Sequence, residues 1–324
     1  MLSTTPLERS IYATVAWFSL FEYPVTIFEV WKWLWRPAGE VKMEEMYDAL
    51  EKSAWLREHV VEDQGFWSLR KAPQKMERRH ERFLDALRKY KKLQSALWYL
   101  SLIPTVRAVA AVNTLSWWHT RPESDIDLFV VARAGTVWLT RLLAVAPFAL
   151  LKRRPQEHGR DPFCFSFFVS EDALALESLQ ISGGDPYLAM WVKSIVPVFD
   201  RGGFFDRFSG ENVWPLQTFP YVSLSKPEGV AFSPRPATSP DQEKAMPRDW
   251  TLNILKFLEA LARKIQEHRL PKQIIDLANK DSRVVLNDSM LKFHENDRRE
   301  EFRRQFEELM TVCNATESPT SSSL

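Results

Sequence analysis

The stretch Ser124–Val131, Ser-Asp-Ile-Asp-Leu-Phe-Val-Val, determines how the rest of the chain is interpreted. Its alternating pattern predicts a β-strand, in which successive side chains point to opposite faces. Asp125 and Asp127 are therefore expected to share one face, and Ile126, Leu128 and Val130 the other. Two carboxylates on one face offer hard oxygen ligands of the kind that hold Mg²⁺, and burying both charges without a cation would be costly.

A preceding buried strand is predicted at Val106–Val112. It leads into Asn113–Trp118, Asn-Thr-Leu-Ser-Trp-Trp, and then through a loop at 121–123 into the acidic strand. This order of strand, tight turn, short helix, loop and Asp-x-Asp strand resembles the polymerase-β-like nucleotidyltransferase superfamily, and more narrowly an uncharacterised bacterial branch of it. Further positions that resemble this branch are Trp138, Leu139, Thr140, Arg141, Phe163, Cys164, Asn212, Trp214, Lys292, Phe293, His294 and Asp297.

The resemblance implies an α+β fold with a palm-like mixed sheet. It also implies transfer of a nucleoside monophosphate from a nucleoside triphosphate to an acceptor, with Asp125 and Asp127 as catalytic ligands of Mg²⁺ or Mn²⁺. In the superfamily a Gly-Ser pair occupies the position of Asn113-Thr114, and the backbone N–H groups of that turn hold triphosphate oxygens. The expected nucleotide-binding residues are Asn113, Thr114, Ser116, Ser124 and Arg141.

Three features depart from the superfamily pattern. Asn113 replaces a glycine, although asparagine is among the residues that best tolerate positive φ. Trp118 replaces a small residue, and with Trp117 it could either stack a base or fill the pocket. The superfamily also adds a third carboxylate from a later strand, whereas the predicted strand Phe163–Val169 contains no acid. The acids that flank this strand are Asp161, Glu171 and Asp172. A second class of function therefore stays open: a degenerate transferase that acts as a binding or regulatory scaffold.

Residues 1–72 are predicted to form a winged-helix-like domain of three helices and a hairpin, whose strands are expected at Trp55–Val61 and Phe66–Leu69. The acids of the third predicted helix are Glu44, Glu45, Asp48 and Glu51. Because these acids would repel DNA phosphates, DNA binding is disfavoured. Protein contact is the preferred role for this domain, and a transcription regulator is the third functional alternative.

Residues 73–214 are predicted to form the nucleotidyltransferase-like domain, which begins with a long linking helix. One face of this helix is basic and has two interpretations: a solvated face, or a contact with the phosphates of a nucleotide or of a nucleic-acid acceptor. A later helix is expected over 171–181. The remaining ranges are a Pro-rich irregular segment at 215–249, a mostly helical C-terminal region at 250–314 and a disordered tail at 315–324.

The composition is typical of a globular protein: 324 residues, 45% of them hydrophobic, with a net charge of +1. This charge gives no global attraction for nucleic acid or membrane. Cys164 and Cys313 offer no disulfide framework, and Val137–Leu151 is too short to span a bilayer. We therefore expect a cytoplasmic protein that has no membrane partner, binds a nucleoside triphosphate and acts on an unidentified acceptor.

Overall fold

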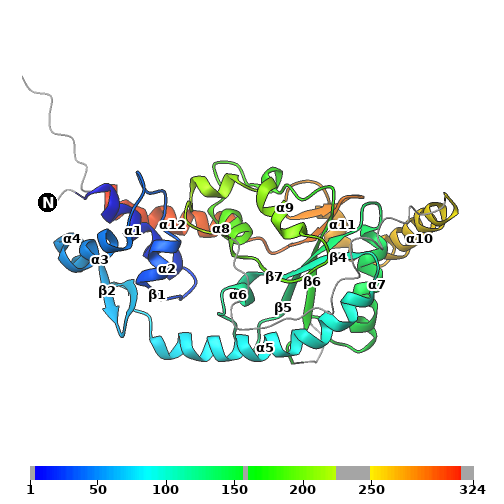
Figure 1. Cartoon of the computed structure of the whole chain (residues 1–324), viewed down its shortest axis with the longest axis horizontal. Coiled ribbons are helices and arrows are strands. Elements are labelled where there is room, and N and C mark those ends of the chain that lie inside the picture. The colour runs from blue at the N-terminus through cyan, green and yellow to red at the C-terminus, as the bar shows by residue number, and fades with distance from the viewer. Residues whose placement is uncertain (1–3, 156–159, 224–248, 315–324) are drawn as a thin grey trace, which may run out of the picture.

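The computed structural model describes residues 4–155, 160–223 and 249–314. Over these ranges the chain is α+β, as the sequence predicts, with helices around a small and a large β-sheet. The two sheets belong to two units that lie end to end along the long axis of the molecule (Figure 1). Most of the expected Pro-rich segment, and all of the expected disordered tail, lie outside the described residues.

The first unit combines four helices with a three-stranded antiparallel sheet of order β1-β3-β2. Thr5 and Thr26 cap the first two helices, because each side chain accepts a hydrogen bond from the backbone N–H of a glutamate three residues later. The elements of this unit are α1 (Pro6–Ser19), β1 (Val25–Thr26), α2 (Ile27–Lys32), α3 (Met43–Lys52), α4 (Ala54–His59), β2 (Val60–Asp63) and β3 (Phe66–Leu69).

The strand expected at Trp55–Val61 is largely a helix, so this prediction was wrong. Residues Ala54–His59 form α4, and the strand begins only at Val60. The cause is Ser53, whose side-chain oxygen accepts a hydrogen bond from the backbone N–H of Leu56 at 3.0 Å. This N-cap satisfies a free donor of the first turn and so favours a helix over an extended segment.

A long helix, α5 (Met76–Leu102), links the two units and runs along the lower side of the molecule in Figure 1. Its buried leucines, Leu93, Leu97 and Leu100, pack in the core of the large sheet. Lys89 is fully buried in the same helix, and its Nζ lies 2.8 Å from a carboxylate oxygen of Asp85. The helix therefore contributes an apolar stripe and a neutralised ion pair to the interior.

The large sheet is mixed and has the order β7-β4-β5-β6-β9-β8, in which only β5 and β6 are parallel neighbours. Its strands are β4 (Val106–Ala111), β5 (Ile126–Ala132), β6 (Phe163–Ser170), β7 (Val196–Asp200), β8 (Val284–Leu286) and β9 (Met290–Phe293). The last two belong to the range 250–314, which the sequence predicts to be mostly helical. At three and four residues, they are too short for their periodicity to be recognised.

Helices cover both faces of the large sheet. Helices α5 and α7 (Val137–Leu150), with part of α10 (Asp249–Glu267), cover one face, and α8 (Pro186–Ser194) and α9 (Phe204–Glu211) cover the other. The expected alternation along β5 is confirmed: the residues that face α5 and α7 are Ile126, Leu128 and Val130, and those that face α8 and α9 are Phe129 and Val131. By the same alternation, Asp127 belongs to the face under α8.

The helix expected over 171–181 was a wrong prediction, because only a short 3₁₀ turn, η1 (Glu177–Leu179), forms there. Asn212 explains the difference: its side chain accepts from the backbone N–H of Leu176 and donates to the carbonyl of Leu174, both at 2.8 Å. These bonds satisfy the backbone without a helix. The remaining short elements are α6 (Asn113–Ser116), η2 (Trp214–Gln217) and α11 (Lys272–Leu277).

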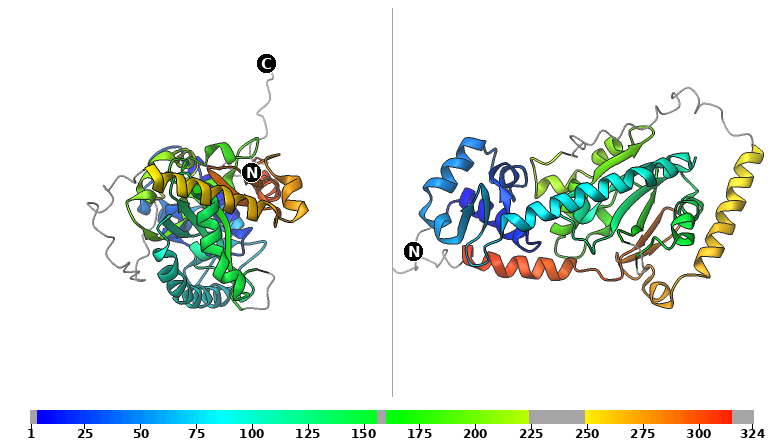
Figure 2. Two further views of the ribbon diagram at one scale, coloured as in Figure 1. Left: turned by 90° about the vertical axis from the view of Figure 1, so that its right-hand side faces the viewer. Right: turned by 90° about the horizontal axis from the view of Figure 1, so that it is seen from below.

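The last helix, α12 (Arg299–Asn314), starts beside the large sheet and returns to the first unit (Figure 2). There it packs on α1, with the ring of Phe306 5.3 Å from that of Trp17. The hydroxyl of Tyr12 donates to the carbonyl of Leu309 at 3.1 Å. A helix that follows the large sheet in sequence therefore completes the core of the first unit.

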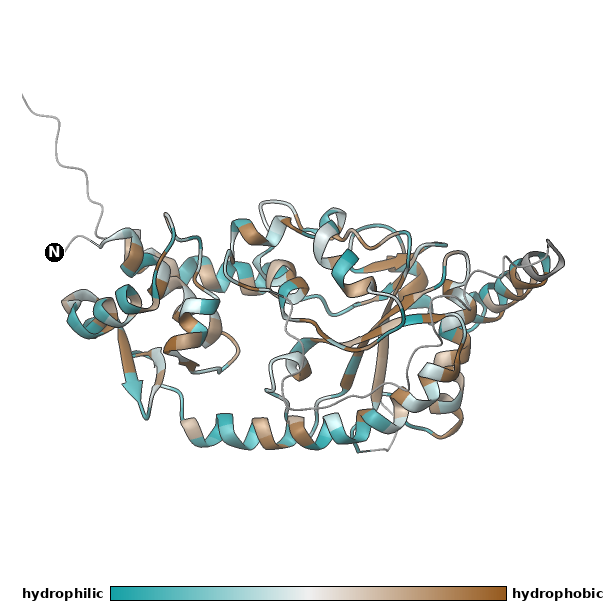
Figure 3. Ribbon diagram, viewed as in Figure 1, coloured by the Kyte–Doolittle hydropathy of each residue, from teal (hydrophilic) through white to brown (hydrophobic). Residues whose placement is uncertain are grey.

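Apolar residues are concentrated in the strands and on the inner sides of the helices (Figure 3). Across the ranges that the structure describes, no helix combines the length and the apolar character needed to cross a bilayer. Both cysteines, Cys164 and Cys313, are free thiols.

Candidate functional site

Four strands of the large sheet, β4, β5, β6 and β9, begin or finish at the same end of the sheet, and the acidic pair lies at this edge, formed by the strand ends. Strand β4 ends beside the start of β5, with the N–H of Val112 donating to the carbonyl of Asp127 at 3.1 Å. Strand β6 begins at the same edge, where Cys164 pairs with Asp127. Strand β9 runs antiparallel to β6 and therefore ends near this edge, just before His294.

A cavity of about 510 Å³ opens at this edge, between the sheet, α8 and the segment that joins β9 to α12. Its charged lining residues are Asp125, Glu295, Asp297, Lys292, Arg298 and Arg299. Its aromatic lining residues are Phe167, Tyr187, Trp191, Phe293 and Phe302. The cavity thus combines Asp125, which directly precedes the central strand, with acidic, basic and aromatic side chains from the opposite wall, in the size range of small-molecule sites.

Asp125 and Asp127 are both half-buried, and each has a raised pKa. Burial raises the pKa of Asp125. Burial also raises the pKa of Asp127, to about 7, and the negative charge of Asp125 adds to this effect, whereas a hydrogen bond from Asn113 opposes it. In the described part of the chain, neither carboxylate forms a direct ion pair with a lysine or arginine, and the positive charge of Lys89 opposes the rise in the pKa of both. The pair is therefore a place where a positive charge would be stabilised.

Asn113 holds the turn between β4 and α6 in a left-handed conformation, with φ of 56°. Its side-chain oxygen accepts a hydrogen bond from the indole N–H of Trp191 at 3.0 Å, and its amide reaches Asp127. The hydroxyl of Ser116 donates to its carbonyl at 2.7 Å. An asparagine here combines tolerance of positive φ with a direct bond to the acidic pair, which a glycine could not provide.

The other expected nucleotide-binding residues occupy different places. The hydroxyl of Ser124 accepts from the backbone N–H of Arg121 at 3.0 Å and so closes a loop. Arg141 donates to the side chain of Gln266 at 2.6 Å, and its guanidinium lies 4.4 Å from the ring centre of Phe293. Thr114, Ser116, Ser124 and Arg141 are not among the residues that line the cavity within the described ranges. Of the five expected residues, the structure brings Asn113 together with the acidic pair.

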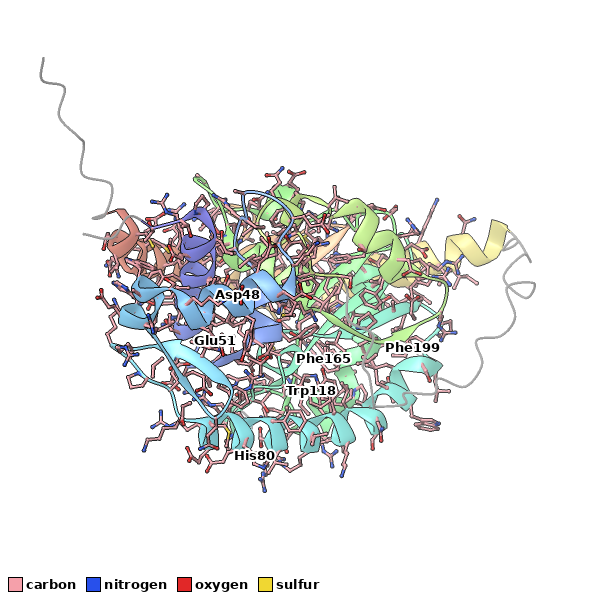
Figure 4. All side chains as sticks on the ribbon, turned by 60° about the vertical axis from the view of Figure 1, so that its left-hand side comes forward. Asp48, Glu51, His80, Trp118, Phe165 and Phe199 are labelled. Carbon is pink, nitrogen blue, oxygen red and sulfur yellow. The ribbon has the colours of Figure 1, made fainter. Side chains whose placement is uncertain are left out.

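The two tryptophans after the turn pack into protein rather than into the cavity. Trp118, at φ of 56°, has its ring 4.4 Å from Tyr90 and 5.4 Å from Phe83, both on α5. Figure 4 shows Trp118 just above this helix. Trp117 lies 5.0 Å from the ring of Phe21 on the other unit. Both rings therefore fill space at the junction of the two units.

The flanking acids do not complete a triad. Asp161 is bound by Arg88 on α5, and Glu171 lies at the opposite end of the sheet, 3.0 Å from Arg107. Asp172 is exposed. No group of three or more His, Cys, Asp or Glu residues is placed to hold a metal ion in the part of the chain that is described. The strand position beside Asp127 is occupied by the thiol of Cys164, which hydrogen-bonds to it.

The opposite wall contains residues of the Lys-Phe-His segment that carried part of the resemblance. Burial, together with the positive charge of Arg299, lowers the pKa of Lys292 to about 8. Burial also lowers the pKa of His294 to about 3, and its Nε2 lies 3.1 Å from the hydroxyl of Ser166. A hydrogen bond therefore fixes His294 in this wall, and the charge of Lys292 changes near neutral pH.

Several cavity residues were not anticipated from the sequence. Tyr187 and Trp191 come from α8, Arg298 directly precedes α12, and Arg299 and Phe302 come from the start of that helix. Arg299 is held by Asp185 at 2.6 Å and by Asp297 at 2.7 Å, so its position is fixed by two carboxylates. The only sequence signal for this wall is its closeness to the Lys292–His294 segment.

Comparisons of the chain with protein-family models, with curated proteins and with solved structures give no match. Its function is therefore inferred from the chemistry of the site.

Proposed function

We propose that the chain is a nucleotidyltransferase of the polymerase-β-like class, which transfers a nucleoside monophosphate from a nucleoside triphosphate to an acceptor hydroxyl. One observation carries the proposal: Asp125 and Asp127, which form no direct ion pair among the described residues, lie at the end of the sheet where a cavity opens, with Asp125 in its lining and Lys292, Arg298 and Arg299 on its opposite wall.

The acidic pair fits a divalent cation, Mg²⁺ or Mn²⁺. Both carboxylates have a raised pKa because burial disfavours their charged forms, and a divalent cation would stabilise those charged forms. Two carboxylates are a sufficient protein contribution for Mg²⁺, which usually keeps waters and takes substrate phosphate oxygens as its other ligands. Such an ion would polarise the phosphates and lower the pKa of the acceptor hydroxyl.

The chain's own residues would bind and orient the nucleotide. Lys292, Arg298 and Arg299 line the wall opposite Asp125 and would meet the triphosphate there; Arg298 also pairs with Glu301, and Arg299 with Asp185 and Asp297. The aromatic side chains of that wall offer faces on which a base can stack. In the reaction, the acceptor oxygen bonds to the α-phosphorus, the bond to pyrophosphate breaks, pyrophosphate leaves and the hydroxyl proton passes to water.

The test is incubation of the full chain with each labelled nucleoside triphosphate and Mg²⁺ or Mn²⁺, followed by separation of labelled acceptor or self-labelled protein. We expect transfer by the native chain and a loss of at least about 100-fold in Asp127→Asn. Asp172→Asn is the matched control, because Asp172 is exposed and lies after β6, at the opposite end of the sheet from the cavity. Equal transfer by Asp127→Asn and the control would contradict the proposal.

A second candidate is a scaffold that binds the nucleotide without transferring it. The observation that favours it is Cys164, whose thiol is the neighbour of Asp127 on the strand that would supply a third carboxylate. Tight, Mg²⁺-dependent nucleotide binding with no labelled product across a broad set of acceptors would support this candidate over the transferase.

For the first unit we propose a winged helix that serves protein contact. The supporting features are the three-stranded sheet beside α1, α2 and α3, and the acids on the exposed side of α3. Two of these acids, Asp48 and Glu51, are labelled in Figure 4 and are exposed. Acids in these positions repel DNA phosphates, so we expect no salt-sensitive binding of duplex DNA by this unit.

A further inference from the structure

Helix α10 packs on α7 through a side that is largely polar. The carboxylate of Glu259 accepts hydrogen bonds from the backbone N–H groups of Trp138 and Leu139 at 2.9 and 2.7 Å. The side-chain amide of Gln266 donates to the carbonyl of Trp138 at 2.7 Å, and Ala262 is buried between these two polar residues. These hydrogen bonds anchor α10 to the large-sheet unit and leave most of its larger apolar side chains outside the contact.

The apolar side of α10 faces solvent. Its residues repeat at intervals of three and four positions and so share one side of the helix: Ile254, Phe257, Leu258, Leu261 and Ile265. The first four of these side chains are between 37% and 67% exposed. A surface helix ordinarily buries such a side against the core. From 254 to 265 this apolar stripe extends over about 16 Å along the axis. It lies at the end of the molecule opposite the first unit (Figure 1).

The charges around the apolar stripe are mainly basic. Residues 253–280 carry six lysines and arginines against three acids, whereas the net charge of the whole chain is +1. Two of the three acids are engaged within the protein: Glu259 with the backbone of α7, and Glu267 in an ion pair of 2.7 Å inside α10. Lys264, which borders the stripe, and Lys272, which follows α10, are both exposed. The surface around the stripe therefore attracts anions.

The end of α7 adds a second exposed apolar patch beside a basic loop. Leu150 and Leu151 are 84% and 65% exposed, and the next two residues, Lys152 and Arg153, are exposed as well. Both α7 and α10 are seen in the view toward this end of the molecule (Figure 2). Apolar side chains next to basic ones thus occur on two helices that pack on each other.

We propose that this end of the molecule binds the surface of an anionic lipid membrane, with the apolar stripe of α10 inserted between the headgroups. Helices with Phe, Leu and Ile on one side and lysines beside them lie in the membrane interface, because the apolar side chains enter the acyl boundary and the lysines meet anionic headgroups. A second copy of the chain, the main alternative occupant, would bring the same excess of positive charge against this surface.

The expectation of no membrane partner had a different basis. It rested on the net charge of the whole chain and on the length of Val137–Leu151, which is too short to span a bilayer. Neither criterion detects an amphipathic helix that lies in the plane of the interface. The proposal concerns a surface outside the candidate site and does not depend on the proposed function.

The test is flotation of the full chain with vesicles of phosphatidylcholine alone, or with about 30% phosphatidylserine added. We expect binding to the anionic vesicles that weakens as salt screens the headgroups. Phe257→Glu should bind at least about ten-fold more weakly, because it places a charge on the apolar side of α10. Lys264→Glu/Lys272→Glu should bind the anionic vesicles at least about ten-fold more weakly, because it reverses two of the charges that attract the headgroups.

The matched controls lie at the opposite end of the molecule. Phe28→Glu changes another exposed phenylalanine, which is 55% exposed on α2. Lys71→Glu/Lys75→Glu reverses two other exposed lysines. Both controls should bind vesicles like the native chain, and circular dichroism of all four variants checks that they are folded.

Three results would overturn the proposal. The first is equal binding of the native chain to neutral and anionic vesicles, or to neither. The second is equal binding by the α10 variants and their controls. The third is a dimer of the free chain, seen by sedimentation, that Phe257→Glu dissociates, since it would assign the stripe to a second copy.

Nucleotide binding by the same samples separates this proposal from the proposed function. With Mg²⁺ and a non-hydrolysable nucleoside triphosphate, all four variants should bind like the native chain, because none of the substituted residues lines the cavity. Loss of vesicle binding with retained nucleotide binding is the expected result for the α10 variants. Vesicle binding by a native chain that binds no nucleotide would contradict the proposed function alone.

Discussion

Half-buried acids at the two ends of the large sheet differ in whether a protein cation pairs with them. At one end Glu171 is held by Arg107 at 3.0 Å and by the backbone N–H of Ala134 at 3.0 Å. At the other end Asp125 and Asp127 form no direct ion pair among the described residues, and Asp125 lines a cavity. A carboxylate that the protein neutralises itself serves the fold, whereas one left uncompensated is a candidate for binding a ligand that carries the missing charge.

The largest expected effect is a difference in transfer activity between variants at the two ends of the sheet. Asp127→Asn should lower nucleotidyl transfer by at least about 100-fold, because it removes half of the charge that would hold the cation. Glu171→Gln should leave the rate constant of transfer unchanged within about two-fold, measured with the same labelled substrates at a temperature where both variants are folded. Similar losses in both variants would remove the distinction between a structural and a functional end.

The next effect is a difference in the free energy of unfolding between variants at the two ends of the sheet. Glu171→Gln should lower the free energy of unfolding by about 2 kcal/mol, since it leaves the mostly buried Arg107 without its ion pair. Asp127→Asn should leave this free energy unchanged or raise it in the absence of metal, because it removes an uncompensated charge. Urea unfolding at pH 8 without divalent ions measures both values. A strong destabilisation by Asp127→Asn would make that acid structural.

The junction between the two units supplies a buried base for comparison with these acids. His119 is almost completely buried, and burial, followed by the charge of Arg82, lowers its pKa to about 3. Because the folded pKa lies below the unfolded value of 6.5, the stabilisation is present above pH 6.5 and is lost as the pH falls toward 3. Between pH 7 and pH 5 this loss should reach about 1–2 kcal/mol.

The measurement is urea unfolding of the native chain and of His119→Gln over that pH range. The variant should show a smaller pH dependence, because it has no imidazole to protonate in the unfolded state. Parallel curves for the two proteins would show that His119 does not contribute to the acid sensitivity of the fold.

The smallest effect concerns the positioning of Asn113. Trp191→Phe removes the indole N–H that donates to the Asn113 side chain, but keeps an aromatic ring in the cavity wall. We expect a loss of about three- to ten-fold in affinity for the nucleotide with Mg²⁺. Trp214→Phe is the matched control, since its indole N–H makes a longer bond, 3.4 Å, to Asn212. Calorimetric titration of both variants provides the comparison.

Sequence periodicity predicted one wall of the site but not the other. The alternation along β5 placed Asp125 and Asp127 on one face and Ile126, Leu128 and Val130 on the other, because strand period is a local property. The tolerance of Asn113 for positive φ was likewise anticipated, and the structure confirms it at 56°. Both features depend on a few neighbouring residues.

The opposite wall depends on contacts between segments far apart in the chain. Trp191 reaches Asn113 across 78 residues, and Arg299 reaches Asp185 across 114 residues, so no local pattern marks these pairs. The same limit explains the missed α4 and η1. In both places a side chain, that of Ser53 or Asn212, accepts a hydrogen bond from a backbone N–H. This bond favours a backbone conformation that the hydrophobic pattern does not predict.

The most direct test of the central claim is calorimetric titration of the full chain with a non-hydrolysable nucleoside triphosphate, with and without Mg²⁺. We predict binding that requires Mg²⁺ and that falls at least ten-fold in Asp125→Asn/Asp127→Asn, while Asp172→Asn binds like the native chain. Binding of equal strength with and without Mg²⁺, or in the double variant, would contradict the claim that this acidic pair holds a cation for a nucleotide.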